Sequence, residues 1–525
     1  MLDVWSWISD LPFSGEWGAT DDNSVSAAVL VFQLATSPCD PTRTLQLQAQ
    51  RTPSSSPANS DVFFITLTVC LRGATPSTLW ASDPYVLNSS GPTTNSTFLL
   101  PLLLQLLQEI VTRAPTTPYS SSGQFQKLRP EPVSWILDTH SPESFSSFFN
   151  LVLLTRLFWA CACDAPSEVG SFYLDSLLCP NIDSLLTASK PVLAKFLVAV
   201  GADAELCFVR TLGYMLAKWL IYREVAAGAG LRTLVPPPLL PAGFSYGVEA
   251  YGYWTLKGYA PIPAMRLSGE PKPFLLEPNE LSLLKYALAH QQLEAVIQLH
   301  YSVAFHEAYV QVSARVDNLR FHVAKLRFSS DDGGESESEY SEERHFVSRV
   351  RAWVGPEIGA TYVAGLTAGR STHNGESETT ELHVGKGGPR NFGMLAREAT
   401  RTRVKDWRWD QDVEGNGVVF DAVLYDTATG QEYCSGGGGD GPRRMRSSGP
   451  NRPFTKARGL IFAGKEYGDE VTWRLGKEME GSVLKWRIGG EVWVTYFPNQ
   501  VHTSFCETRS VEWCDEVDLP LIPGK

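Results

Sequence analysis

A tryptophan-rich stretch at positions 470–518 most constrains what this chain can fold into. Strand-forming residues alternate there between apolar and polar, which is the period of a strand with one buried face. Gly489-Gly490 separate two such runs, and two-residue hairpin turns favour glycine because they need positive φ. We therefore predict a β-hairpin that turns at Gly489-Gly490. This pairing would place Trp486 opposite Trp493, with both indoles on one buried face.

The length and composition indicate a large globular protein. The chain has 525 residues, of which 43% are hydrophobic and 19% are charged. A globular chain of this length holds roughly two or three domains. Its formal net charge is -12 at pH 7, whereas a nucleic-acid-binding protein would show a basic face. We therefore expect no nucleic-acid partner.

The spacing of the cysteines and the composition of the apolar runs indicate the cellular location of the protein. The nine cysteines include no C-x-x-C pair, so the sequence does not support a zinc or thioredoxin-like site. Several of them lie in apolar runs, as free thiols do in a reducing compartment. The N-terminus lacks the pattern of a secretory signal, and the apolar stretches Phe145–Cys163 and Leu206–Val225 contain charged residues. We expect buried helices there, no transmembrane segment, no cofactor and a cytoplasmic location, with a nuclear location as the alternative.

The order of predicted elements begins with strands and continues with helices. The strands are predicted at Val25–Ala35, Arg43–Gln50 and Asp61–Arg72. Ser141-Pro142-Glu143 supplies an N-cap, a proline at the first helical position and an acid in the first turn of one helix. The other predicted helices are Leu99–Arg113, Pro166–Leu178, Pro191–Val200, Ala204–Ala226 and Asn279–Tyr301, and an irregular segment is expected at Ala229–Lys272.

After position 305 the pattern changes to the alternation of strands. His306–Val316 and Leu319–Phe328 are predicted to form a hairpin that turns at Asp317-Asn318. The acid-rich segment 329–344 and the glycine-rich segment 434–453 cannot bury a core, so we expect disordered loops there. Further strands are predicted at His345–Val354, Ala360–Leu366, Thr400–Asp410, Gly417–Tyr425, Gly459–Ala463, Val471–Leu475 and Ser504–Trp513.

The fold class that follows from these elements is α+β. We expect a small N-terminal β layer at 1–96, a helical domain at 97–304 and an antiparallel, tryptophan-rich β sandwich or barrel at 305–525. Three N-terminal strands are too few to form a stable domain alone, so this layer should pack on the helices. In the alternative, these strands join the C-terminal sheet and the whole chain is one unit.

The sequence also resembles a plant-specific family of uncharacterised proteins. The segments that carry the resemblance are GVVFDAVLYDTATGQEY, KEMEGSVLKWRIGGEVWVTYFP and TRSVEWCDEVDLPLIP in the C-terminal part, and THSPESFSSFFNLV and RTLGYMLAKWLI in the helical part. The resemblance extends over most of the chain. It implies an intracellular plant protein, and it implies no activity, ligand or catalytic residue.

One motif suggests an enzyme. The sequence GFSYG at 243–247 fits G-x-S-x-G, in which a serine nucleophile lies on a strained turn between a strand and a helix. The preceding VPPPLLPA cannot form a central strand, and the following VEAYGYW is a poor helix. Ser245 is therefore the candidate catalytic residue of a serine hydrolase. The alternative is a loop of glycines and aromatic residues that packs on the helices.

A second motif approaches the spacing of a calcium-binding loop. Asp410, Asp412 and Glu414 alternate, Gly415 stands at the sixth position and Asp421 at the twelfth. A calcium loop needs alternate oxygen ligands, a glycine and a final acid at these positions. Here a glutamate replaces the usual aspartate or asparagine at the fifth position, and the flanks resemble strands. The alternative is an acidic turn that joins two strands.

Trp407, Arg408 and Trp409 are the candidate ligand-binding residues. The two indoles share one face of a predicted strand, and Arg408 lies on the other face. Exposed tryptophans can stack on sugars or line an apolar ligand cavity, whereas buried ones form the core of a sandwich.

The function predicted from these observations is that of a non-enzymatic intracellular binding or scaffold protein. Its partner would be another protein, or a small apolar ligand held in the β domain. The alternative function is that of a serine hydrolase that uses Ser245.

Overall fold

The computed structural model shows a chain that forms two compact units. The N-terminal unit comprises residues 1–116, 122–236 and 263–289, and the β unit comprises residues 117–121, 237–262 and 290–525. The structure describes residues 3–11, 28–53, 62–73, 76–88, 95–116, 127–226, 243–265, 287–326, 344–368, 372–384, 397–425, 459–463, 470–497 and 507–523.

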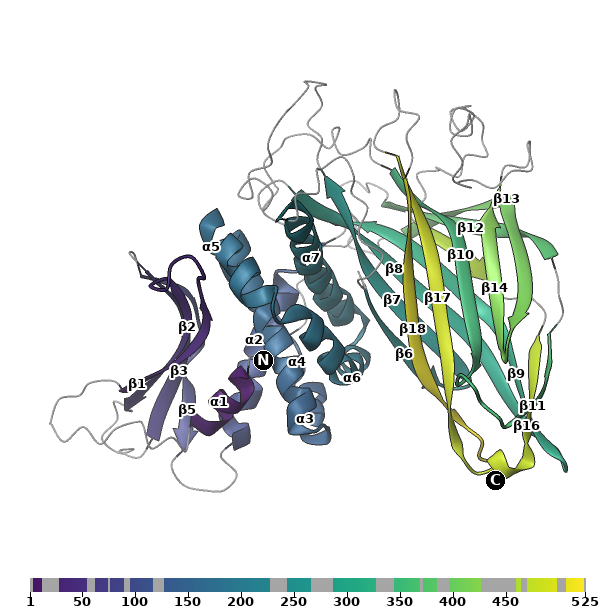
Figure 1. Cartoon of the computed structure of the whole chain (residues 1–525), viewed down its shortest axis with the longest axis horizontal. Helices are drawn as coiled ribbons and strands as arrows, with labels where there is room; N and C mark the ends of the chain where they lie inside the picture. The colour runs from purple at the N-terminus through teal and green to yellow at the C-terminus, as the bar shows by residue number, and fades with distance from the viewer. Residues whose placement is uncertain are drawn as a thin grey trace, which may run out of the picture. The chain divides into compact units, whose positions relative to one another are not determined.

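The N-terminal unit contains an antiparallel sheet of five strands (Figure 1). The strand order is β1-β2-β3-β4, and β5 also pairs with β3. Along β2, Leu45, Leu47 and Ala49 are buried and alternate with glutamines, as the period of two predicts. These strands form a sheet separate from the larger one, so the alternative in which they join the C-terminal sheet is wrong. The strands are β1 (Ala28–Thr36), β2 (Thr44–Pro53), β3 (Val62–Arg72), β4 (Ser77–Ala81) and β5 (Tyr85–Asn88).

Helices make up the rest of the described N-terminal unit. The predicted N-cap is confirmed, because the Ser141 hydroxyl accepts from the Ser144 backbone amide at 3.4 Å and Pro142 opens the helix. Two single-turn π-helices, Trp159–Cys163 and Leu174–Leu178, extend α4 and α5. The helices are α1 (Val4–Asp10), α2 (Asn95–Thr112), α3 (Pro130–Thr139), α4 (Pro142–Phe158), α5 (Ser167–Tyr173), α6 (Ile182–Val200) and α7 (Ala202–Ala226).

The segment Pro142–Cys163 is long and apolar enough to cross a membrane by length and composition alone. Within the described structure, 89% of its apolar window is buried inside the protein. Its contacts are those of a core helix, since α4 packs against α2, α6 and α7. Arg156 near its end forms an ion pair with Glu109 of α2.

The β unit contains, among the described residues, a sheet of 13 strands. The main path runs β18-β17-β10-β14-β13-β12-β15-β9-β8-β7-β6, and every recorded pairing is antiparallel (Figure 1). The strands are β6 (Phe244–Ala250), β7 (Tyr253–Met265), β8 (Ala287–Phe305), β9 (Tyr309–Lys325), β10 (Arg344–Pro356), β11 (Val363–Thr367), β12 (Thr372–Val384), β13 (Arg397–Glu414), β14 (Gly417–Leu424), β15 (Gly459–Ala463), β16 (Val471–Gly476), β17 (Val483–Phe497) and β18 (Glu507–Pro520).

The sheet folds over on itself, so that its first and last strands pack together. The Gly247 amide of β6 donates to the Asp515 carboxylate of β18 at 2.7 Å. The layers enclose a core of fully buried indoles: Trp254 stacks on Trp486 at 5.5 Å between ring centroids, and Trp473 meets Trp486 edge-on at 5.2 Å. An α+β fold with a small N-terminal β layer, a helical middle and a C-terminal antiparallel β structure is therefore confirmed.

The predicted hairpin at Gly489-Gly490 is wrong, because β17 runs unbroken through both glycines. β10 pairs with β17 on one side and β18 pairs with it on the other. A Cβ at Gly490 would lie 2.2 Å from Cδ1 of Ile297, and a Cβ at Gly489 would lie 2.1 Å from the ring of Trp353. The glycines therefore allow close side-chain packing on both faces of a strand. Trp486 is in the core as predicted, whereas Trp493 lies on the opposite face.

Two further predictions between positions 279 and 328 are wrong. The predicted helix Asn279–Tyr301 is largely strand β8, where Leu293 and Ile297 are among the alternate residues buried against the core. The predicted turn at Asp317-Asn318 is a bulge within β9, because Gln298 pairs with Asn318 and Leu299 with Val316. β8 pairs with β9 from Gln291 to Phe305, and this cross-strand pairing overrides the helical pattern of the sequence.

The segment predicted to be irregular holds the hairpin of β6 and β7. Its turn is Tyr251-Gly252, with φ of 54° and 80°, and two positive φ values are what a tight hairpin turn needs. The predicted loop 434–453 lies outside the described residues. So does the predicted loop 329–344, apart from Arg344 at the start of β10.

Trp486→Ala is expected to lower the free energy of unfolding by about 3–5 kcal/mol, because its buried indole packs against two other tryptophans. Trp493→Ala is the matched control and should cost about 1 kcal/mol, since that indole is only half-buried and lies 4.8 Å from the Arg349 guanidinium. Urea unfolding measures both losses. Equal losses would contradict the continuous strand, because a hairpin would bury both indoles alike.

Lys218 of α7 is a buried cation whose ammonium lies 5.5 Å from the ring centroid of Tyr214. Burial lowers the pKa of Lys218 from 10.5 to about 8. Below pH 8 the folded state bears the full cost of the buried charge, and this cost is relieved as the pH rises from 8 to 10.5. Lys218→Met should therefore raise the free energy of unfolding at pH 7 by up to about 3 kcal/mol. The gain should shrink towards pH 10.

Urea unfolding of the wild type and the variant at pH 7, 9 and 10 tests this expectation. Lys195→Met, at an exposed position of α6, is the matched control and should change the free energy of unfolding by less than about 0.5 kcal/mol. A gain from Lys218→Met that stays constant across the three pH values would contradict the depressed pKa.

Candidate functional site

The outer face of strands β13, β14, β10, β17 and β18 carries side chains in rows that cross the sheet. Directly paired residues in antiparallel strands point to the same face, so the strand register places these rows. The row that we call the tryptophan row consists of Asp412, Val419, Trp353, Gly489 and Cys514. The next row, called the acidic row, consists of Asp410, Asp421, Arg351, Glu491 and Glu512.

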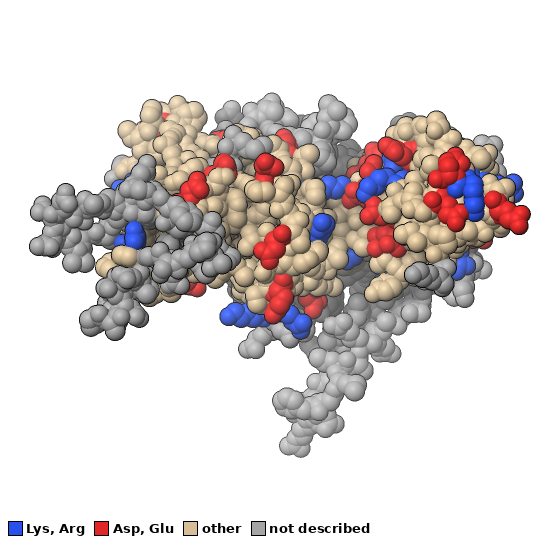
Figure 2. Space-filling model, turned by 90° about the horizontal axis from the view of Figure 1, so that it is seen from below, with Lys and Arg blue, Asp and Glu red and all other residues tan. Residues whose placement is uncertain are grey.

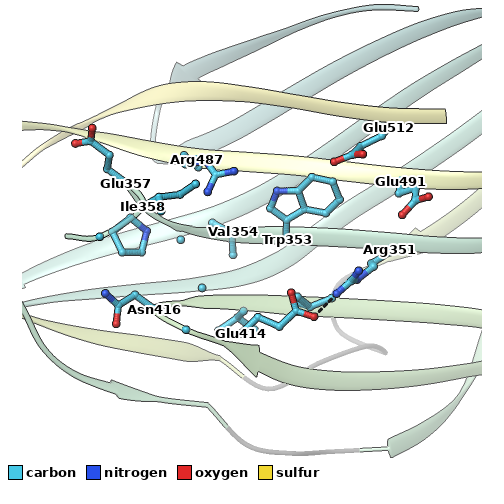
Figure 3. Close-up of a pocket in the computed structure, with 17 residues that line it drawn as sticks. Arg351, Trp353, Val354, Glu357, Ile358, Glu414, Asn416, Arg487, Glu491 and Glu512 are labelled. Carbon is cyan, nitrogen blue, oxygen red and sulfur yellow. Dashed lines mark hydrogen bonds and ion pairs between the residues drawn. The ribbon is translucent and has the colours of Figure 1, made fainter. Parts of the chain in front are cut away.

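Trp353 stands at the centre of the tryptophan row. An added Cβ at Gly489 would lie 2.1–2.3 Å from three atoms of its indole, namely Cε2, Cζ2 and Nε1. Near-equal distances to three ring atoms show that the face of the indole covers the glycine. The absence of a side chain at Gly489 therefore lets the ring lie against the sheet. Trp353 remains half-buried and lines a surface cavity (Figure 3).

This cavity has a volume of about 590 Å³, within the range of small-molecule sites. Trp353 and Val419 supply apolar lining. Charged side chains and two loops surround Trp353 (Figure 3). One loop is the segment 357–359, and the other is the hairpin turn Gly415-Asn416 between β13 and β14. Gly359 and Gly415 adopt φ of 78° and 62°, so both loops depend on residues that tolerate positive φ.

The charges of the cavity are partly paired. The Arg351 guanidinium forms an ion pair with Glu414, as the dashed line in Figure 3 marks. Outside the cavity lining but on the same face of the sheet, Nε of Arg349 donates to Asp421 at 2.9 Å. Glu491 and Glu512 lie on one side of Trp353, and Arg487 lies on the other (Figure 3). The cavity is therefore a polar site with an aromatic side chain in its lining.

The face of the molecule shown in Figure 2 mixes both signs of charge. On the face shown in Figure 2, acidic and basic side chains are interspersed over the right-hand part of the molecule. Mixed charge of this kind does not resemble the single-sign basic face with which proteins bind nucleic acids.

Trp407 and Trp409 share a face as predicted, but this face is the inner one. They are 2% and 3% exposed and meet the ring of Phe462 edge-on at 5.0 and 5.1 Å. Arg408 points outwards, and its Nε lies 3.2 Å from the Asp410 carboxylate. The prediction of a binding platform at Trp407, Arg408 and Trp409 is therefore wrong, because a buried indole cannot offer a surface for a ligand.

The acids of the predicted calcium loop lie on two strands of a hairpin. Asp410, Asp412 and Glu414 follow one another along β13, and Asp421 of β14 pairs with Asp410. Asp421 binds Arg349 and Glu414 binds Arg351. No group of three or more potential metal ligands occurs among the described residues. The arrangement is the acidic turn that we gave as the alternative.

Ser245 lies within strand β6, directly opposite Gly258 of β7, and is 8% exposed. β6 continues to Ala250 and turns directly into β7, so the strand-to-helix turn of a serine nucleophile is not formed. Among the described histidines, none is recorded in a hydrogen bond with Ser245. The motif's glycines have a packing explanation, because a Cβ at Gly243 would meet Tyr259 O at 2.5 Å and one at Gly247 would meet Val517 at 2.8 Å.

Trp353 was missed by our sequence analysis, although the sequence contains a signal for it. Along RVRAWVG, Arg349, Arg351 and Trp353 alternate with Val350 and other small apolar residues. A tryptophan that shares its strand face with arginines lies on the polar face of the sheet. This pattern indicates an outward-facing aromatic residue, whereas Trp407 and Trp409 flank an arginine on the opposite face.

No family model and no curated protein matches the chain. Among solved structures, similarity is found to the Clostridium perfringens delta-toxin, at 9% identity and a TM-score of 0.25, over 53% of this chain and 96% of the toxin. A pore forming protein matches at 10% identity and a TM-score of 0.20, over 52% and 94%. The Clostridium perfringens NetB toxin in its membrane inserted form matches at 11% and 0.18, over 42% and 88%. Similarity of this extent defines neither a fold family nor a function for the chain.

A serine-directed fluorophosphonate probe is expected to leave Ser245 unlabelled, because its hydroxyl is buried in a strand and no described histidine is hydrogen-bonded to it. Labelling of the purified full-length protein, followed by peptide mass spectrometry, measures this directly. Ser245→Ala serves as the control. Labelling that is present in the wild type and lost in this variant would show that the serine is reactive.

Proposed function

We propose that this protein is a non-enzymatic binding protein whose β unit holds a small polar ligand against Trp353. The observation that carries the proposal is the indole that lies on Gly489 and lines the cavity. An aromatic ring supplies a large apolar contact area, and the surrounding polar groups orient the ligand. Neighbouring strands hold the ring in place, so the site is organised before the ligand binds.

The chemistry of the cavity favours a polar ligand over the apolar one expected from the sequence. The described interior of the β unit is filled by side chains such as Trp254, Trp473 and Trp486, which contact one another. The cavity lies on the outer face instead, with carboxylates and guanidiniums in its walls. A purely apolar ligand would leave these charged groups desolvated without partners, which is unfavourable.

An intracellular location belongs to the same proposal. Among the described cysteines, those of the N-terminal unit are free thiols, as expected for a reducing compartment: Cys39, Cys70, Cys161, Cys163, Cys179 and Cys207. The alternative function, a serine hydrolase, draws no support from the surroundings of Ser245, which lies inside a strand.

Trp353→Ala is expected to weaken binding by about tenfold, because contact with an aromatic face contributes roughly 1–2 kcal/mol. Gly489→Ala should weaken it as well, since the added methyl group must displace the indole. Trp493→Ala is the control, because Trp493 shares the outer face of β17 but does not line the cavity.

Saturation-transfer NMR with a panel of neutral sugars, alkylammonium ions and small carboxylates measures binding to the full-length protein. The proposal requires at least one compound that binds the wild type and the Trp493→Ala variant but binds the Trp353→Ala variant much less. It fails if no compound binds, or if every bound compound is insensitive to Trp353→Ala.

A further inference from the structure

We infer that the Trp353 cavity binds an organic cation, specifically an alkylated ammonium group that lies between the indole and the carboxylates of Glu491 and Glu512. This inference rests on the proposed function, and it names the chemical class of the ligand. The relevant observations are the charge balance of the cavity, the pairing of the two glutamates and the position of the aromatic ring.

Acids outnumber bases in the walls of the cavity. The carboxylates are Glu357, Glu414, Glu491 and Glu512, whereas the guanidiniums are Arg351 and Arg487. Arg351 is the cross-strand partner of Glu491, but its guanidinium forms its ion pair with Glu414. The excess of negative charge therefore remains on the side of the cavity where Glu491 lies.

Glu491 and Glu512 are direct partners across the β17–β18 pair. Side chains in such positions have Cβ atoms roughly 5 Å apart, and like charges there destabilise a sheet. In the described part of the chain, no ion pair is recorded for either glutamate. Arg487 lies four residues along β17 from Glu491, roughly 13 Å away at the rise of a strand. A bound cation would convert this repulsion into attraction.

Trp353 determines which kind of cation fits. The tryptophan row lies beside the acidic row, so the indole and the two glutamates border the same part of the cavity (Figure 3). The negative face of an indole attracts cations, and it is the strongest aromatic partner for quaternary ammonium groups. Alkyl groups on the nitrogen also cover the apolar lining that Trp353 and Val419 supply. A cation with apolar substituents therefore satisfies the ring and the carboxylates together.

The test compares choline with 3,3-dimethylbutan-1-ol, which has nearly the same shape but carries no charge. Titration of the full-length protein, followed by NMR, gives a dissociation constant for each compound. Choline should bind at least tenfold more tightly than the alcohol, and raising the salt concentration should weaken choline binding only. In the double variant Glu491→Gln/Glu512→Gln, the ratio of the affinity for choline to the affinity for the alcohol should fall towards one.

Glu516→Gln is the matched control, because Glu516 is an exposed residue of β18 that does not line the cavity. It should leave the preference for choline unchanged. Trp353→Ala should weaken choline binding by about tenfold, and it should weaken binding of the alcohol as well. Both glutamine substitutions remove like-charge repulsion, so the double variant should fold.

Each remaining outcome separates the inference from the proposed function. Equal affinity for choline and the alcohol, or a preference that survives the double glutamine substitution, overturns the organic-cation inference. Binding of a neutral sugar but not of choline, with loss in Trp353→Ala, overturns the inference and leaves the proposed function standing. Failure of every compound in the panel to bind overturns both.

Discussion

Strand β17 has two adjacent glycines, Gly489 and Gly490, and a side chain from a neighbouring strand packs on each of them from opposite faces of the sheet. Both the core and the candidate site depend on the space that these two glycines leave. Ile297 of β8 reaches the inner face at Gly490, and Trp353 of β10 covers the outer face at Gly489. Successive residues of a strand point to opposite faces, so one glycine serves the packing of the core and the other serves the cavity. A register shift of two residues, which keeps the same face outward, would place Arg487 or Glu491 opposite Trp353 and displace the indole.

Local patterns predicted the elements whose stability is mainly local. The Ser141 cap, the helices around it and the alternation along β2 all follow from nearest-neighbour chemistry. The prediction of a hairpin at Gly489-Gly490 was wrong because glycine is used in proteins for two different physical reasons. Glycine permits positive φ, but it also permits close approach, and the sequence between positions 470 and 518 does not distinguish these uses. For Gly489, the deciding contact is Trp353 on another strand, which no local pattern reveals.

The ligand-binding residues were predicted at the wrong strand for a related reason. Alternation shows which residues share a face, but the burial of that face depends on what packs against it. Trp407 and Trp409 were grouped correctly, yet their partner Phe462 makes that face the interior. Asp410 and Asp421 looked like ends of one loop, and cross-strand pairing instead makes them neighbours in a charged row. Trp353 could have been recognised by its shared face with Arg351, since a strand face that carries arginines faces solvent.

The packing of β6 against β18 has a consequence for the behaviour of the protein in a crowded solution. Terminal strands of an open sheet expose unpaired amides and carbonyls, and these can recruit strands of other molecules. Here the amide of Gly247 is occupied by the Asp515 carboxylate, and Val517 lies so close that a methyl group at position 247 would not fit. The first and last strands of the main path therefore shield each other, which protects a long antiparallel sheet against edge-to-edge aggregation.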